Sequence, residues 1–376
     1  MMEKKCKKVT CDICGNEAEE GELTEFDGQH LCESCLEDET LICTYCEERI
    51  WMSENAGDAN TPLCQNCYDA YYVSCVRCGR IIHSADAYYE DDEEDDPYCS
   101  ECWEHHSHDN ATIHDYYYKP TPIFHGNDDR YFGVELEIDG AGESSSSAKE
   151  ILSIANVSEE LIYCKHDGSL DDGFEIVTHP MTLDFHHRLM PWKAVMSQAV
   201  ELGYTSHKAR TCGLHVHVNR STFGYTEEQQ DTCIARTLYF FEKHWEELLK
   251  FSRRTELQLK RWAARYGYKE QPKEILENAK KGFGGGRYSS VNLQNQDTIE
   301  FRIFRGTLKY NTLIATLQLV NKLCSVAIAM SDEELKGLSW TSFVENIKPG
   351  ENQELIQYLK ERRLYINEPV ESEVEV

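Results

Sequence analysis

Residues 133–138 read Gly133-Val134-Glu135-Leu136-Glu137-Ile138, a stretch in which acidic and apolar side chains alternate. Successive side chains of a β-strand point to opposite faces, so Glu135 and Glu137 would share one face and the apolar residues the other. Two further stretches alternate in the same way, Leu214-His215-Val216-His217-Val218 and Thr298-Ile299-Glu300-Phe301-Arg302-Ile303. Together they predict a sheet with one face on a core and an open face that carries carboxylates, imidazoles and a guanidinium.

Each of these strands, taken singly, also fits the solvent-facing side of an ordinary amphipathic sheet. Exposed strand faces usually mix Thr, Lys, Gln and Ser, whereas nearly every outward residue here is a carboxylate or an imidazole. Clustered carboxylates raise one another's pKa unless a cation lies between them. Carboxylates with one or two imidazoles and no thiolate suit Mg²⁺ or Mn²⁺ carrying a phosphate better than they suit structural zinc.

The chain mixes strand and helix patterns from Tyr131 onward. Clustered strands, with long helices between some of them, favour an α+β fold with a largely antiparallel sheet and flanking helices. Strands are predicted at Tyr131–Asp139, Leu161–Lys165, Phe174–Thr178, Leu214–Asn219, Tyr288–Leu293 and Thr298–Phe304. Helices are predicted at about 147–156, 182–202, 226–251, 272–281, 311–330 and 351–362.

Two loops adjoin these strands. Lys165-His166-Asp167-Gly168-Ser169-Leu170 precedes the strand that contains Glu175, and a turn there would bring Asp167 and Glu175 to the rim of the open face. Gly284-Gly285-Gly286-Arg287 precedes the last strands and offers a flexible backbone beside a cation. The triple glycine fits a phosphate-binding loop and a plain hinge equally well.

The N-terminal third contains a cysteine repeat with a period of 32 residues. Cys11, Cys43 and Cys75 each open a C-x-x-C pair, and a second pair follows after 17, 17 and 20 residues. This is the spacing of a four-thiolate zinc site, because two tight knuckles complete one tetrahedron. The predicted ligands of about three structural Zn²⁺ ions are Cys11, Cys14, Cys32, Cys35, Cys43, Cys46, Cys64, Cys67, Cys75, Cys78, Cys99 and Cys102.

Two alternatives stay open for these cysteines, a disulfide framework and zinc sites that interleave across repeats. The start of the chain, Met1-Met2-Glu3-Lys4-Lys5, lacks the apolar segment of a signal peptide. We therefore expect a cytoplasmic location, where thiols bind metals more often than they form disulfides. The predicted organisation is three zinc-binding repeats of four cysteines each at 1–104, a linker at 105–130, a second domain at 131–365 and an acidic tail at 366–376.

The distribution of charge argues against nucleic acid as a partner. The formal charge is −29, and residues 1–110 contain 28 acidic against 7 basic residues, so the cysteine repeats cannot neutralise many phosphates. Docking of a protein or recruitment of a substrate is favoured over a purely structural role. We also expect no membrane contact, because the most apolar stretch, Leu313–Met330, is interrupted by Gln318, Asn321 and Lys322.

Several short motifs, taken in order, resemble the amidoligase family over about residues 131–330. They are Phe132–Glu137, His166–Leu170 with Glu175-Ile176-Val177, Cys212–Val218, Arg287-Tyr288, Thr298–Arg302 and Gly306-Thr307-Leu308. The family consists of carboxylate-amine ligases with a glutamine-synthetase-like catalytic fold and is often found in phage genomes, so a phage-encoded chain would act in the host cytoplasm. The cysteine repeats resemble zinc-ribbon or LIM-like modules in spacing.

The resemblance implies an ATP- and magnesium-dependent ligase that forms an amide or peptide-like bond. A carboxylate would attack the γ-phosphate of ATP, an acyl phosphate would form, and an amine would displace the phosphate. Motif by motif, the residues near the acyl-side metal would be Glu137, Asp167 and Glu175, and those near the ATP-side metal Glu135, His215 and Glu300. Contacts to phosphate oxygens would come from His217, Arg287 and Arg302, and Arg305 would serve phosphate or substrate.

Two other functions stay open at this stage. One is a non-catalytic zinc-module adaptor with a decayed ligase domain, although the intact set of carboxylates argues against decay. The other is a metal-dependent hydrolase that uses His215 and His217, although such enzymes commonly use strand-helix barrels and this chain lacks their regular alternation. The identities of the acid and the amine do not follow from the fold.

Overall fold

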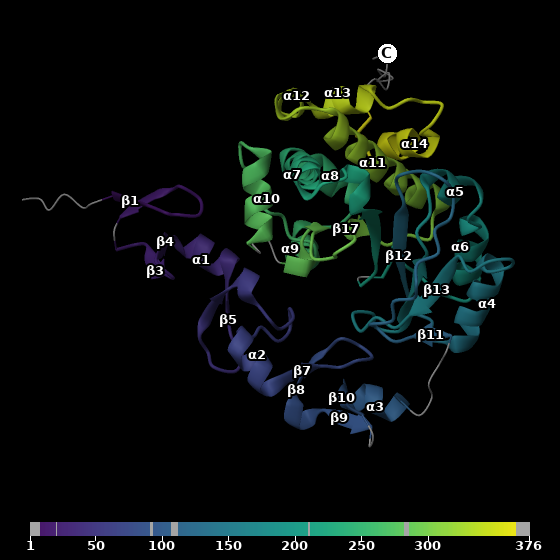
Figure 1. The fold of residues 1–376 in the computed structure, drawn as a ribbon, viewed down its shortest axis with the longest axis horizontal. Helices are drawn as coiled ribbons and strands as arrows, with labels where there is room; N and C mark the ends of the chain where they lie inside the picture. The colour runs from purple at the N-terminus through teal and green to yellow at the C-terminus, as the bar shows by residue number, and fades with distance from the viewer. Residues whose placement is uncertain are drawn as a thin grey trace, which may run out of the picture.

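The computed structural model describes residues 8–19, 21–90, 93–106, 112–209, 211–281 and 286–365 (Figure 1). Two glycines of the predicted flexible loop, Gly284 and Gly285, and the predicted tail at 366–376 lie outside the described residues. The sheet and the long helices form the larger body. The small elements of the cysteine repeats curve along it and lead to β11, where the chain enters the sheet (Figure 1).

One seven-stranded sheet forms the centre of the larger body, in the order β11-β13-β14-β12-β15-β17-β16. Neighbouring strands are antiparallel except for β11 and β13, which run parallel. The prediction of an α+β fold with a largely antiparallel sheet is confirmed. The strands are β11 (Ile113–His114), β12 (Phe132–Asp139), β13 (Ile162–Lys165), β14 (Gly173–Thr178), β15 (Gly213–Asn219), β16 (Val291–Asn292) and β17 (Thr298–Arg305).

The predicted strands agree with the structure to within one residue at each end, apart from the one predicted at Tyr288–Leu293. There, Gly286–Tyr288 forms a 3₁₀ turn, η4, and only the two residues of β16 pair with β17. β11 lies inside the stretch predicted as a linker, and its residues pair with Cys164 and Lys165 of β13. Part of residues 105–130 therefore belongs to the sheet.

Two of the long predicted helices are each divided in the structure. The helix predicted at 182–202 is two helices because Pro191, which has no backbone N–H to donate, separates them. The helix predicted at 226–251 is interrupted at His244, whose φ of −111° and ψ of 32° are not helical. The helices of the larger body are α4 (Ser145–Ala155), α5 (Leu183–Arg188), α6 (Trp192–Glu201), α7 (Glu227–Lys243), α8 (Trp245–Ser252), α9 (Glu256–Trp262), α10 (Pro272–Lys280), α11 (Tyr310–Ala329), α12 (Asp332–Gly337), α13 (Trp340–Glu345) and α14 (Gln353–Glu361), with η3 at Arg220–Phe223.

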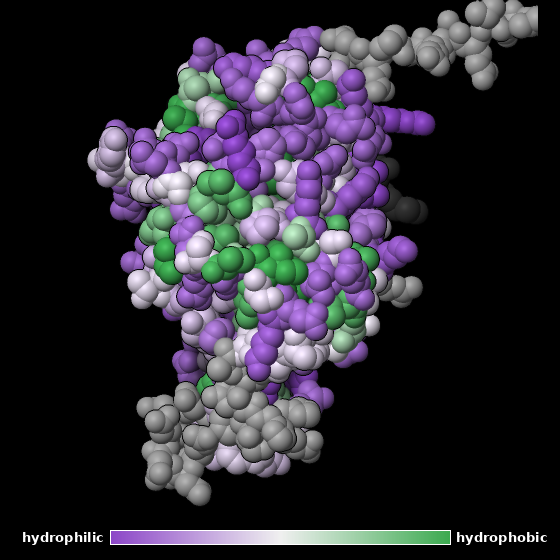
Figure 2. Space-filling model, turned by 90° about the vertical axis from the view of Figure 1, so that its right-hand side faces the viewer, coloured by the Kyte–Doolittle hydropathy of each residue, from purple (hydrophilic) through white to green (hydrophobic). Residues whose placement is uncertain are grey.

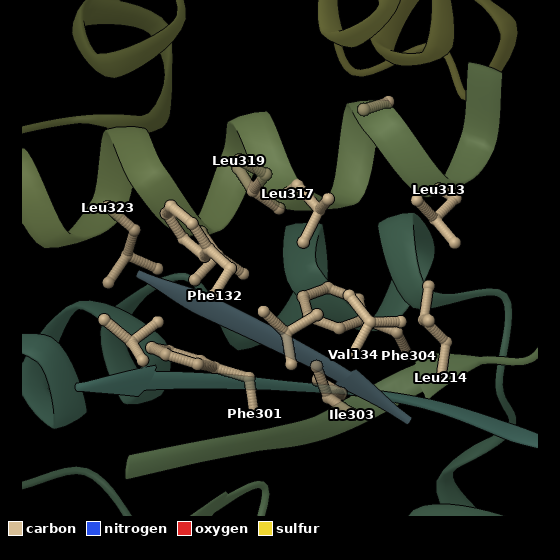
Figure 3. Packing of buried hydrophobic residues seen from close by; sticks show 14 of the residues in the cluster. Phe132, Val134, Leu214, Phe301, Ile303, Phe304, Leu313, Leu317, Leu319 and Leu323 are labelled. Carbon is tan, nitrogen blue, oxygen red and sulfur yellow. The ribbon is translucent and has the colours of Figure 1, made fainter. Parts of the chain in front are cut away.

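The apolar face of the sheet packs against α7 and α11. Leu317 and Leu323 of α11 lie over Phe132 and Val134 of β12, as Figure 3 shows. By length and hydropathy α11 could cross a membrane, but 72% of that window is buried inside the protein, as in the core helix of a folded domain. The face of the molecule shown in Figure 2 is mainly hydrophilic, with hydrophobic residues near its middle. The apolar stretch of α11 is therefore accounted for by core packing.

Each cysteine repeat folds into one or two short hairpins followed by one short helix. The helices start at the second C-x-x-C pair, and Cys32 and Cys64 occupy the N-cap positions of α1 and α2. These elements are β1 (Lys8–Thr10), β2 (Glu17–Glu19), β3 (Thr24–Phe26), β4 (Gln29–Leu31), α1 (Glu33–Glu39), β5 (Thr40–Ile42), β6 (Arg49–Trp51), η1 (Met52–Glu54), α2 (Gln65–Tyr71), β7 (Tyr72–Ser74), β8 (Ile81–His83), η2 (Ser84–Asp86), β9 (Tyr88–Glu90), β10 (Glu93–Tyr98) and α3 (Ser100–His106).

Candidate active site

The strand register places the predicted acidic and imidazole groups beside one another on the open face of the sheet. Glu135 of β12 is directly opposite His215 of β15, and Glu137 of β12 is opposite Glu175 of β14. On the far side of β15, His217 is opposite Glu300 of β17. Side chains directly opposite each other on one face of a sheet lie within contact distance, so three separate motifs form one cluster.

His215 lies among three carboxylates. Its Nδ1 is 3.1 Å from Oε2 of Glu135 and 3.7 Å from Oε1 of Glu300, and its Nε2 is 3.5 Å from Oε1 of Glu137. His217 extends the cluster, with Nε2 3.1 Å from Oε1 of Glu135. Arg302 donates a hydrogen bond from its guanidinium to Glu300, its neighbour but one on β17.

These groups are removed from water, which makes their charges interact strongly. Glu137, Glu175 and Glu300 are at most 5% exposed. Burial, together with the nearby Glu135 carboxylate, raises the pKa of Glu175 well above its ordinary value. Burial opposes the ionisation of Glu135 as well, but His217 and His215 outweigh it and hold the pKa of Glu135 well below that value. One carboxyl of the cluster thus favours its protonated form while a neighbour stays ionised.

At least two sets of three donor atoms in this cluster have the spacing of metal ligands. Glu135, His217 and Glu300 form one set and Glu135, Glu175 and His215 the other, and the donor atoms of each set lie within 4.8 Å of one another. This grouping differs from the one that the family resemblance implies, because His217 enters a donor set and Glu135 belongs to both. Carboxylate oxygens with single imidazoles suit a hard divalent cation.

Other residues of the site have positions that sequence reasoning did not identify. Lys165 of β13 directs its Nζ to 3.9 Å from Glu175, and Asn292 of β16 donates a hydrogen bond of 2.8 Å to Glu300. Both follow the period-two alternation of their strands, so that pattern could have identified them. Arg254, just after α8, approaches the cluster from a loop, and the sequence contains no signal for its place.

The cluster forms the floor of a cleft of about 370 Å³. Asp167 and Arg287, both predicted for the site, lie along this cleft, whereas Arg305 lines a separate pocket. The opposite wall comes from the cysteine repeats and the segment that follows them, and includes Asp58, Asn60, Cys78, Arg80, Tyr116 and Tyr117. The repeats therefore border the cleft directly.

The third cysteine repeat touches the turn that carries Asp167. A Cβ added at Gly168 would lie 2.9 Å from the carbonyl oxygen of Cys78, so only a residue without a side chain fits this approach. The backbone N–H of Tyr116 donates a hydrogen bond of 2.8 Å to the carbonyl of Arg77. The position of the Asp167 turn therefore depends on the conformation around Cys78.

The cysteines form three tetrads, each within a single repeat, and the ligand atoms of a tetrad lie within 4.8 Å of one another. The Sγ atoms of Cys14 and Cys32 are 3.8 Å apart, and those of Cys78 and Cys99 are 3.7 Å apart. A tetrahedral zinc with Zn–S bonds of about 2.3 Å places its sulfurs roughly 3.8 Å apart, whereas a disulfide requires about 2.05 Å. The described tetrads therefore fit zinc sites that close within repeats rather than across them or as disulfides.

Comparison with known proteins gives one family match. Residues 153–324 match the family described as "Putative amidoligase enzyme". No curated protein gives a significant match. Among solved structures, the bifunctional glutathione synthetase from Pasteurella multocida aligns with 62% of this chain at 14% identity and a TM-score of 0.34. The aligned part is 46% of that synthetase, so this chain spans less than half of its length.

Proposed function

We propose, from the match of residues 153–324 to the amidoligase family, that this chain is a ligase that couples the conversion of ATP to ADP to amide formation between a carboxylate and an amine. The observation that carries the proposal is the cluster of Glu135, Glu137, Glu175 and Glu300 around His215 at the floor of a cleft, with all but Glu135 buried. A face that only contacted solvent would not bury so many like charges, because each costs desolvation free energy.

The donor set fits magnesium or manganese. The described cluster concentrates four carboxyl groups, and the nearest cations are Arg302 beside Glu300 and Lys165 beside Glu175. Burial, together with the nearby Glu135 carboxylate, raises the pKa of Glu175, and a bound cation would offset both effects. Glu135, Glu175, Glu300, His215 and His217 would hold the metal, and Glu137 adjoins them. A divalent cation bound there would offset the negative charge of the ATP phosphates.

The basic side chains of the cleft have donors to spare for phosphate oxygens. Arg302 is partly buried beside Glu300, and its Nε has no hydrogen-bond partner among the described residues. Arg287 lines the same cleft and donates to the hydroxyl of Tyr288 through one nitrogen, and among the described residues its other N–H groups have no hydrogen-bond partner. Preorganised donors of this kind stabilise charge that develops on a phosphoryl group during transfer.

The proposed reaction has two steps. An oxygen of the substrate carboxylate attacks the γ-phosphorus of ATP, the bond to the bridging oxygen breaks, and ADP leaves an acyl phosphate behind. The amine nitrogen then attacks the acyl carbon, the phosphate leaves with the acyl oxygen, and the proton lost by the amine ends on the released phosphate. The products are an amide, ADP and inorganic phosphate.

The cysteine repeats are part of this proposal. They form one wall of the cleft, which supports a role in holding a protein or peptide substrate next to the carboxylate cluster. Their tetrads fit about three structural zinc ions, which would supply much of the folding free energy of such small units.

The test is release of ADP from labelled ATP in the presence of magnesium, with panels of candidate acids and amines. We expect ADP release to require both substrates and to fall on the order of 100-fold in Glu300→Gln and in Glu135→Gln. Arg188→Gln, an exposed surface change, serves as the control. Absence of ATP binding would favour the adaptor, and hydrolysis without nucleotide would favour the hydrolase.

A further inference from the structure

A second concave site lies beside the carboxylate cluster, a pocket of about 500 Å³ with the opposite charge. Glu246 is the one acidic residue among the described residues that line it. The chain as a whole has a formal charge of −29, so a concentration of basic residues in one pocket is unusual for it. The basic residues of the pocket are Lys250, Arg253, Arg254, Arg305 and Arg362, with His207 among them.

The four arginines of this pocket have no carboxylate partner at ion-pair distance in the part of the chain that the structure describes. Instead the guanidinium groups donate to backbone carbonyls: Arg254 to Phe304 at 3.3 Å, Arg305 to Arg253 at 3.4 Å, and Arg362 to Lys250 at 2.8 Å. These hydrogen bonds hold the groups in place and leave their charge available to a ligand.

The ends of two helices, α8 and α14, contribute arginines to the pocket. Arg253 ends α8 with a φ of 62°, a left-handed conformation that is uncommon for residues other than glycine. Arg362 caps the C-terminus of α14. Backbone strain of this kind concentrates at functional sites, where the surrounding structure maintains it.

Arg305 reaches the open face because of a bulge in β17. The register with β15 shifts between Leu214 and Val216, which pair with Phe304 and Phe301, so β17 has one extra residue there. Ile303 and Phe304 therefore both belong to the core, as Figure 3 shows. Strict alternation would place Arg305 with Ile303 on the core side, and the bulge returns it to the side of Glu300 and Arg302.

The pocket and the carboxylate cluster meet at Gly213. Gly213 pairs with Arg305 and donates its backbone N–H to Glu137. A nitrogen of the Arg254 guanidinium and Nε2 of His215 each lie 2.7 Å from the point that a Cβ would occupy at Gly213. Arg254 of the basic pocket thus lies close to His215 of the carboxylate cluster.

We infer that this pocket binds a second anionic group of the acid substrate, while the carboxylate to be activated lies beside Glu137. The inference rests on the proposed function and narrows its substrate class to compact acids with at least two negative charges. Several guanidinium groups without acidic partners bind carboxylate or phosphate through paired N–H donors. A substrate with a single charge would leave those groups without a counter-ion.

The experiment measures binding calorimetrically on the full-length, zinc-loaded protein without ATP. The probes are butyrate, glutarate and propane-1,2,3-tricarboxylate, at low salt and at about 0.3 M NaCl. We expect affinity to rise with the number of carboxylates and to fall with salt. Arg305→Gln and Arg362→Gln should each weaken the tricarboxylate about tenfold, Arg305→Lys less, and Arg188→Gln not at all. Thermal unfolding of every variant checks that it is folded.

Inorganic phosphate is the second arm of the experiment. If phosphate binds more tightly than the carboxylates, and its binding depends on Arg305 and Arg362, the second anionic group of the substrate is a phosphate. If the carboxylates bind more tightly than phosphate, that group is a carboxylate. Equal binding of butyrate and the tricarboxylate, or unchanged binding in both arginine variants, would overturn the inference. Binding of ATP with magnesium, measured separately with Glu300→Gln, tests the proposed function independently of the pocket.

Discussion

Nδ1 of His215 lies 3.1 Å from Oε2 of Glu135, and the two residues are directly opposite each other in the antiparallel pair of β12 and β15. The contact follows from strand register, since a shift of either strand by one residue would turn its own side chain toward the core. The same register brings Glu137 opposite Glu175 across β12 and β14. The side chains of the candidate active site are therefore held in place by central strands of the sheet, which are more rigid than loops.

The buried carboxylates of the cluster should lower the free energy of unfolding of the metal-free protein. In magnesium-free buffer at about pH 8, Glu175→Gln should raise the free energy of unfolding, because glutamine carries no charge that burial opposes. The folded pKa of Glu175 is raised, so the wild-type chain loses stability from this group as pH rises above the ordinary glutamate value, and the gain in the variant should grow over that range.

Urea unfolding followed between about pH 5 and 8 measures this gain, with the exposed Glu345→Gln as the matched control. Added magnesium should stabilise the wild type more than Glu175→Gln, because the variant lacks one proposed ligand. A variant less stable than the wild type at the upper end of this range would show that Glu175 is adequately compensated by Lys165.

Gly213→Ala should impair activity more than it impairs folding. The new methyl group would occupy the space that Arg254 and His215 share, 2.7 Å from an atom of each, and would displace both side chains. We expect turnover to fall at least about tenfold, since small misplacements at a reacting centre are costly. Gly350→Ala, where nothing lies within 4 Å, is the control for adding a methyl group. Equal turnover in the two variants would contradict this account of the site.

The third cysteine repeat should matter to catalysis, and the first should not. Cys78→Ser and Cys14→Ser should each lower the zinc content from about three ions per chain to about two. Only Cys78→Ser should also reduce turnover, because the carbonyl of Cys78 packs against Gly168 in the Asp167 turn. Elemental analysis and ADP release on the same preparations measure both effects. A loss of turnover of the same size in both variants would instead indicate a general need for the array.

The buried, neutral ring of His186 should make the free energy of unfolding fall in mild acid. Its Nε2 faces the carbonyl of Phe132 at 3.0 Å and its Nδ1 accepts from the Trp192 indole at 3.3 Å, an arrangement that requires the neutral ring. Burial lowers its pKa from 6.5 to about 4. The unfolded chain binds the proton first, so stability is lost as pH falls from 6.5 toward 4, on the order of 3 kcal/mol in total.

The measurement is the pH dependence of urea unfolding for the wild type and His186→Gln. The glutamine keeps a donor and an acceptor but cannot be protonated, so its stability should change less between about pH 6.5 and 5. Parallel curves for the two proteins would show that His186 does not titrate between the folded and unfolded states.

The sequence predicts those residues of the candidate site that lie on strands and follow the period-two alternation of side chains. Alternation in β12, β15 and β17 identified Glu135, His215, Glu300 and their neighbours, and the same alternation in β13 and β16 indicates Lys165 and Asn292. Periodicity has no information about loops, so it could not place Arg254. It also mispredicts the face of Arg305, because a bulge changes the count by one residue.

The sequence by itself determined most of the strands, the acidic and imidazole face, and the C-x-x-C pairs of the cysteine repeats, because these depend on spacing along a few residues of backbone. Tertiary structure alone decided that each tetrad closes within its repeat, that the third repeat borders the cleft beside the Asp167 turn, and that four arginines meet in one pocket next to Glu137. Those arrangements depend on contacts between residues far apart in the chain, whose free energies come from packing and desolvation in the folded protein and leave no periodic trace in the sequence.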